Sequence, residues 1–110
     1  MNDTITPTEL KTKLNNKMDI QLLDVRRKND LDSDPAMLPR AVWHDPAESN
    51  TWAEALSSDT EVFIYCARGG SVSKSTMETL RAKGLTVQYV EGGLAGWKES
   101  GGEVIPGQSK

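Results

Sequence analysis

The chain has 110 residues and a formal net charge of −3, from 13 basic and 16 acidic residues. This length is sufficient to bury a hydrophobic core without disulfides or metal, and we expect one domain over residues 1–110. The slightly negative charge, without a cluster of Lys and Arg, argues against a nucleic-acid partner. One Cys and one His exclude an internal disulfide or a Cys-x-x-Cys pair and argue against a zinc, iron–sulfur or other metal cofactor.

No apolar run approaches the roughly 20 residues of a membrane-spanning helix, and the first four residues lack the charged-then-apolar pattern of an export signal. We therefore expect a cytoplasmic enzyme or carrier with no membrane partner. Because the chain has a single thiol, any sulfur chemistry must pass to a second molecule.

The stretch 6–16 predicts the first helix. Thr6 caps it, a Pro fills its first turn, and Glu9 stands three residues after the cap, which is the capping-box spacing. Leu10 and Leu14 then share one face.

The next part of the chain alternates between extended and irregular segments. Residues 20–25 predict a strand with the carboxylate of Asp24 near its end, and the polar stretch 26–31 can form one helical turn. Residues 31–39 are expected to be irregular because two prolines interrupt them. Residues 41–43 predict a short strand.

Asp45 and Glu48 repeat the cap-Pro-Glu pattern and predict a second helix. Trp52, Ala55 and Leu56 are its candidate buried residues. We expect the tryptophans of this region in the core or at its rim rather than in a binding platform.

The centre of the chain predicts a strand followed by a helix. Val62–Tyr65 are four β-formers without a polar interruption, which is typical of a strand buried on both faces. A helical face at three- and four-residue spacing follows, and Gly84 stands in the usual position for a helix end. That face is made of Val72, Thr76, Leu80 and Lys83.

A strand over 85–90 and a short helix over 94–100 complete the pattern, and a loose tail is expected from about residue 104. Strands that alternate with helices through short loops indicate an α/β layer sandwich with a mainly parallel sheet. In such sheets the ligand site lies beyond the carboxyl ends of the strands. The residues that follow predicted strands are Asp24, His44, Cys66 and Gly92.

Cys66 lies at the end of the central strand, just before the helix start. A thiol there faces the positive end of the helix dipole and unpaired backbone N–H groups, both of which favour the thiolate. Arg68 adds a full positive charge nearby. Gly69 and Gly70 allow the short loop to curl with its amides inward, as an anion-binding nest.

A lone Cys after an apolar run is also a common type of buried small hydrophobe. A buried structural thiol has no need of a flexible turn rich in hydrogen-bond donors, and this favours a reactive Cys66.

Three segments together carry a family resemblance: Leu22–Arg26 (LLDVR), Tyr65–Ser71 (YCARGGS) and Glu91–Trp97 (EGGLAGW). In this order and spacing, the chain resembles a single-domain rhodanese, a thiosulfate sulfurtransferase-like protein. The resemblance implies a three-layer α/β/α domain with a central parallel five-stranded sheet. It also implies that Cys66 lies in a cradle-shaped loop after the central strand.

The resemblance further implies a two-step reaction, in which Cys66 takes the outer sulfur of thiosulfate or of a persulfide donor and then passes it to a thiol or to cyanide. Arg68 would attract the anionic donor. Ser71, ahead of Ser73, is the candidate that donates a hydroxyl to the persulfide, although Ser71 can equally serve only to cap the helix. The backbone N–H groups of the loop would form the cradle: Ala67, Arg68, Gly69, Gly70, Ser71 and Val72.

Asp24 and Arg26 match the family's strand-end pair, for which we expect a structural role. His44 is expected to be a satisfied surface residue, with a place in the pocket as the alternative. The segment 31–41 departs from the family pattern, so the acceptor specificity can differ. Gly92 and Trp97 are expected to have mainly structural roles.

Three other hypotheses remain open. The protein can be a persulfide carrier or sensing module that delivers sulfur to a dedicated partner protein with little turnover. A related phosphatase or arsenate reductase needs an Arg that clamps the oxyanion, and that position is Val72 here, so phosphatase activity is the weaker hypothesis. An inactive scaffold of the same fold is disfavoured by the intact Cys66 loop.

Overall fold

The computed structural model describes residues 3–16, 20–68 and 70–105. In this part of the chain, five parallel strands form one sheet in the order β1-β5-β4-β2-β3. The predicted α/β class and mainly parallel sheet are therefore confirmed. The strands are β1 (Thr4–Ile5), β2 (Ile20–Asp24), β3 (Val42–Trp43), β4 (Glu61–Tyr65) and β5 (Val87–Val90).

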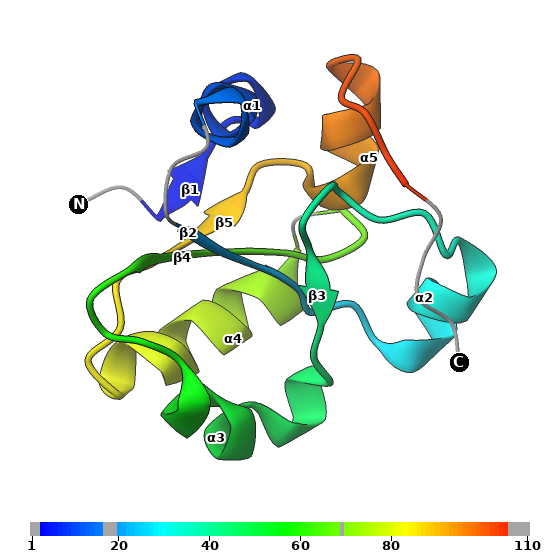
Figure 1. Ribbon diagram of the computed structural model, residues 1–110. Coiled ribbons are helices and arrows are strands. Elements are labelled where there is room, and N and C mark those ends of the chain that lie inside the picture. The colour runs from blue at the N-terminus through cyan, green and yellow to red at the C-terminus, as the bar shows by residue number, and fades with distance from the viewer. Residues whose placement is uncertain (1–2, 17–19, 69, 106–110) are drawn as a thin grey trace.

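The helices form a layer on each side of the sheet (Figure 1). Helices α1 and α5 cover one face, and α3 and α4 cover the other. Helix α2 lies beside the end of the sheet near β3. The helices are α1 (Pro7–Asn15), α2 (Lys28–Ser33), α3 (Ser49–Trp52), α4 (Ser71–Ala82) and α5 (Gly93–Glu99).

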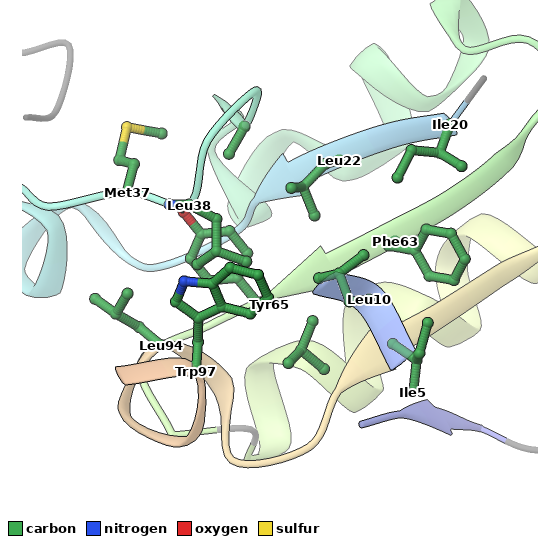
Figure 2. Close-up of a cluster of buried hydrophobic side chains, with 12 residues drawn as sticks. Ile5, Leu10, Ile20, Leu22, Met37, Leu38, Phe63, Tyr65, Leu94 and Trp97 are labelled. Atoms are coloured by element: carbon green, nitrogen blue, oxygen red, sulfur yellow. Dashed lines mark hydrogen bonds between the residues drawn. The ribbon is translucent and has the colours of Figure 1, made fainter. Parts of the chain in front are cut away.

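Each face of the sheet carries its own hydrophobic core. On the α1/α5 face, Leu10, Phe63 and Trp97 belong to one buried cluster (Figure 2). On the α3/α4 face, Ile64 and Leu80 belong to the second. The central strand supplies both clusters because successive side chains point to opposite faces. Each large side chain buried in this way stabilises the fold by about 1.5–3 kcal/mol.

The first helix begins as the sequence predicts. The Thr6 hydroxyl accepts a hydrogen bond from the Glu9 backbone N–H at 3.1 Å, and the Glu9 carboxylate accepts one from the Thr6 backbone N–H at 3.0 Å. This capping box satisfies two N–H groups that the helix itself cannot pair. It confirms the predicted start of α1.

The predicted second helix is wrong in its continuity. Residues 46–48 and 53–55 form 3₁₀ turns on either side of α3, although Asp45 does cap the first of them by accepting from the Ala47 N–H at 2.9 Å. Ala53 is buried and Ala55 is exposed, which reverses the expectation for Ala55. A 3₁₀ turn rotates about 120° per residue rather than about 100°, so the buried position shifts.

The predicted face of α4 is half right. Thr76 and Leu80 are buried as expected, but Val72 is only half-buried and Lys83 is exposed. The buried stripe instead includes Ser73 and Met77, which stand at helical spacing to Thr76 and Leu80. Gly84, with φ of 89°, ends the helix as predicted.

The last described residues pack against the core. Trp97 is 1% exposed and donates from Nε1 to the Glu103 carbonyl at 2.7 Å. Ile105 forms an antiparallel bridge with Met37, with N–H to carbonyl distances of 2.8 and 2.9 Å. The rest of the predicted loose tail, 106–110, lies outside the described residues. Within the described ranges, no helix is long and apolar enough to cross a membrane.

Candidate functional site

The register of the sheet brings three strand ends to one edge. Asp24 pairs with Tyr65 of β4 and with Trp43 of β3. Because the strands are parallel, the residues that follow them lie at the same edge. Cys66, directly after β4, is therefore a close neighbour of the end of β2.

Helix α5 holds the base of the Cys66 loop. The Cys66 carbonyl accepts from the Leu94 N–H at 2.8 Å, and the Ala67 carbonyl accepts from the Ala95 N–H at 3.1 Å. Gly96 allows the turn from β5 to pack closely against α5, since a Cβ on Gly96 would lie 2.6 Å from the Glu91 carbonyl oxygen. The first turn of α5 therefore fixes where the loop leaves β4.

The loop offers several backbone donors at the entrance of α4. Gly70 is the N-cap of α4 and has no side chain to cap it. Among the described residues, the N–H groups of Ala67, Arg68 and Gly70 donate to no backbone or side-chain acceptor. Cys66 is 6% exposed, whereas Arg68 and Ser71 are exposed. Gly69 lies outside the described residues.

Ser73 carries a buried hydroxyl without a partner. Its side chain is fully buried on the first turn of α4, and its Oγ has no hydrogen-bond partner in the described part of the chain. Helical side chains lean toward the N-terminus of their helix, so Ser73 leans toward the loop end of α4. Leaving such a hydroxyl unpaired costs about 1–3 kcal/mol.

Asp24 and Arg26 form a buried ion pair at the end of β2. Asp24 is 0% and Arg26 1% exposed. Arg26 Nη2 donates to Asp24 Oδ2 at 2.7 Å, and its Nε lies 3.0–3.1 Å from both carboxylate oxygens. The Arg26 backbone N–H adds a bond to Asp24 Oδ1 at 2.9 Å. The pairing expected from the sequence is thus present.

Tyr65 extends this pair into a network, although its place in an apolar run does not mark it as a polar member of the site. Its hydroxyl donates to Asp24 Oδ2 at 3.0 Å and accepts from the Leu38 N–H at 3.3 Å. Burial, together with the negative charge of Asp24, raises the pKa of Tyr65, so the phenol stays protonated and acts as a donor. Burial by itself lowers the pKa of Arg26, but the hydrogen bond and charge of Asp24 outweigh it and raise the pKa.

The same network also binds the segment 31–41, which departs from the family pattern. Arg26 Nη1 donates to the Asp34 carbonyl at 2.6 Å, and Nη2 donates to the Ala36 carbonyl at 3.0 Å. These bonds explain how an irregular stretch packs onto the strand ends with its backbone carbonyls paired. Asp24 and Arg26 therefore hold the strand end and this segment together, and every guanidinium nitrogen of Arg26 donates to one of them.

His44 is in contact with Trp52. The two rings stack with centroids 4.7 Å apart. Burial lowers the pKa of His44, which keeps it neutral near pH 7. Both neighbouring indoles are half-buried, and each donates to a backbone carbonyl: Trp52 to Asp45 at 2.7 Å and Trp43 to Arg26 at 2.9 Å. These tryptophans lie at the core rim, as expected.

Two clefts flank the loop. The larger, of about 560 Å³, lies between the segments after β2 and β3 and the first turns of α4. The smaller, of about 280 Å³, is bordered by Ala67, Arg68 and α5. No group of three or more His, Cys, Asp or Glu side chains among the described residues could hold a metal ion. The lining of the larger cleft is Arg27, Lys28, Asp45, Pro46, Ala47, Ser71, Val72, Ser75 and Thr76.

Among solved structures, the fold is similar to that of a rhodanese-like domain protein from Staphylococcus aureus. That protein is 28% identical, the match covers 98% of this chain and 100% of the other, and the TM-score is 0.79. A rhodanese-related protein from Thermoplasma volcanium is 25% identical, with 94% and 98% of the two chains covered and a TM-score of 0.80.

Curated relatives match only in part. The chain is 38% identical over 50 residues to tRNA 2-selenouridine synthase of Shewanella sp. (strain ANA-3), which covers 46% of this chain and 14% of that protein. The Shewanella oneidensis enzyme gives the same identity over the same length. The family model of the Rhodanese-like domain matches residues 6–100. The chain therefore belongs to the rhodanese-like domain family, a sulfurtransferase superfamily.

Proposed function

We propose that the protein is a sulfurtransferase that carries one sulfane sulfur on Cys66. The supporting observation is the place of this thiol, at the end of β4 and at the entrance of α4, beside loop N–H groups that have no acceptor within the described residues. Such donors stabilise an anion that forms at the sulfur. Membership of a sulfurtransferase superfamily supports the same chemistry.

The first step loads the sulfur. The Cys66 thiolate attacks the outer sulfur of thiosulfate; a new S–S bond forms, the old one breaks, and sulfite leaves with the bonding electron pair. The product is a Cys66 persulfide anion, which the N–H groups of the loop can stabilise. The side chain of Arg68 borders the smaller cleft and supplies positive charge for the donor and for the departing sulfite.

The second step discharges it. A thiolate or cyanide attacks the outer sulfur, and the electron pair of the broken bond returns to Cys66 as thiolate. Of the two candidate serines we favour Ser73 over Ser71 as the donor to the persulfide, since the Ser73 hydroxyl is buried and unpaired within the described residues, whereas Ser71 is exposed.

The test of this proposal is brief exposure to thiosulfate followed by intact-mass analysis. We expect the native chain to gain one sulfur atom, which maps to the peptide containing Cys66. Cyanide or a thiol should remove it and restore the original mass. A chain that gains no sulfur from thiosulfate or from a small persulfide would contradict the proposal.

Arg68→Ala should raise the KM for thiosulfate by about tenfold, which corresponds to about 1.4 kcal/mol of lost attraction, while kcat falls by less than about threefold. The reason is that the exposed Arg68 guanidinium attracts free thiosulfate to the site and so acts mainly on binding. Steady-state transfer from thiosulfate to cyanide measures both constants. Arg68→Lys is the matched control, because it keeps the charge, and a larger loss in kcat than in KM would place Arg68 at the sulfite-leaving step.

A persulfide carrier is the second candidate, favoured by the burial of Cys66, which is only 6% exposed. A sulfur held there is shielded from bulk acceptors and suits delivery to a partner protein. Many turnovers per minute from thiosulfate to cyanide would support the enzyme. Complete loading that discharges slowly to every small acceptor would support the carrier.

A further inference from the structure

The larger cleft borders the Cys66 loop where the loop enters α4, and Cys66 itself is not part of its lining. Ser71 and Val72, which belong to the proposed cradle, also line this cleft. Its other walls come from Arg27 and Lys28 after β2 and from residues 45–47 after β3. A molecule in the cleft would therefore lie against the loop from the side of α4.

The size of the cleft indicates an organic molecule. About 560 Å³ falls within the range of roughly 300–1,000 Å³ that small-molecule sites occupy. Cyanide and thiosulfate would leave most of this volume empty. The cleft is thus better matched to an organic thiol or persulfide than to the small inorganic reactants.

The charged side chains that line the cleft differ in how readily a ligand could bind them. The Lys28 ammonium already pairs with Asp32 at 2.8 Å, and the Asp45 carboxylate accepts from the Ala47 N–H at 2.9 Å. Arg27 is exposed, and among the described residues its side chain makes no hydrogen bond or ion pair. Of these two cations in the cleft, the Arg27 guanidinium is therefore the one that a ligand can bind without first breaking an ion pair.

We propose that this cleft binds the sulfur acceptor and selects a small organic thiol that carries a carboxylate, with Arg27 as the residue that binds that carboxylate. A guanidinium matches a carboxylate with two parallel N–H···O bonds. The positive end of α4 also favours an anionic ligand. The inference rests on the proposed function, because it concerns the discharge of the same persulfide.

The test compares three acceptors on thiosulfate-loaded protein: 3-mercaptopropionate, which has the carboxylate, 2-mercaptoethanol, which lacks it, and cyanide. Arg27→Ala should lower kcat/KM for 3-mercaptopropionate by about tenfold, the effect of one lost charged contact. Discharge by 2-mercaptoethanol and cyanide should stay within about twofold of the native rates. Lys83→Ala is the control: it removes an exposed cation near the far end of α4 that lines neither cleft, and discharge by all three acceptors should stay within about twofold of the native rates.

An equal loss for all three acceptors, or no loss for any, would overturn the proposal. Binding to unloaded protein separates it from the proposed function: an NMR titration with 3-mercaptopropionate should saturate in the native chain and weaken in Arg27→Ala. If no sulfur loads but this difference appears, the binding site stands and the sulfur chemistry falls. If sulfur loads but the titration shows no dependence on Arg27, the assignment of the cleft is wrong.

Discussion

Cys66→Ala is expected to abolish sulfur loading and to lower transfer from thiosulfate to cyanide by more than about a thousandfold, because no other residue can take over the role of a removed nucleophile. The variant should still fold. Removing one sulfur atom from a site that is 6% exposed should cost only about 1 kcal/mol of unfolding free energy. Intact mass, thiocyanate formation and urea unfolding measure the three quantities.

This variant separates the two interpretations of a buried lone thiol. A Cys that only fills space would leave transfer unchanged on Cys66→Ala and reduce stability alone. Cys66→Ser is the matched control, since it keeps nearly the same size but replaces the thiol by a hydroxyl, which is a much poorer nucleophile. Transfer by either variant within about tenfold of the native rate would rule out the proposed role of Cys66.

The sequence predicts those features whose signal lies within a few neighbouring residues. The cap of α1 depends on Thr6 and Glu9 alone, and the buried strand β4 depends on the run Val62–Tyr65. The Asp24–Arg26 pair is similarly local, as its members are two residues apart. In each case the physical cause acts over one turn or one strand, so the pattern is sufficient.

The features that the sequence misses depend on the register of the sheet. Tyr65 reads as one of four apolar residues, yet its hydroxyl meets Asp24, which is 41 residues away, because Asp24 and Tyr65 are opposite each other in β2 and β4. The burial of Ser73 depends on a face of α4 that is rotated from the predicted one. The sequence does contain part of the signal for the contact between Asp24 and Tyr65, since polar residues at the carboxyl ends of parallel strands meet at one edge of the sheet.

The larger cleft could not be predicted from the sequence either. Its walls come from segments that follow β2, β3 and the Cys66 loop, and only the sheet order places these segments together. Arg27 alone reads as one charge in a polar stretch. Arg26 and Arg27 are adjacent in the sequence but have opposite environments. Arg26 is fully buried and paired, whereas Arg27 is exposed in the cleft.

Arg26→Met should reduce the free energy of unfolding by about 3–5 kcal/mol, because it leaves the Asp24 carboxylate buried without its charged partner. It also removes the donors to the Asp34 and Ala36 carbonyls. We expect the segment around Ala36 to loosen and sulfur transfer by the folded fraction to fall. Urea unfolding followed by Trp fluorescence gives the stability.

The double variant Asp24→Asn with Arg26→Met should recover part of this loss, since the buried charge itself is then gone, whereas the Ala36 and Asp34 carbonyls stay unpaired. Lys28→Ala is the surface comparison: it breaks an ion pair whose partners are each 60% exposed, and it should cost no more than about 1 kcal/mol. A cost for Arg26→Met as small as that of Lys28→Ala would mean that water reaches Asp24. The strand-end network would then not be the rigid support on which the Cys66 loop is placed.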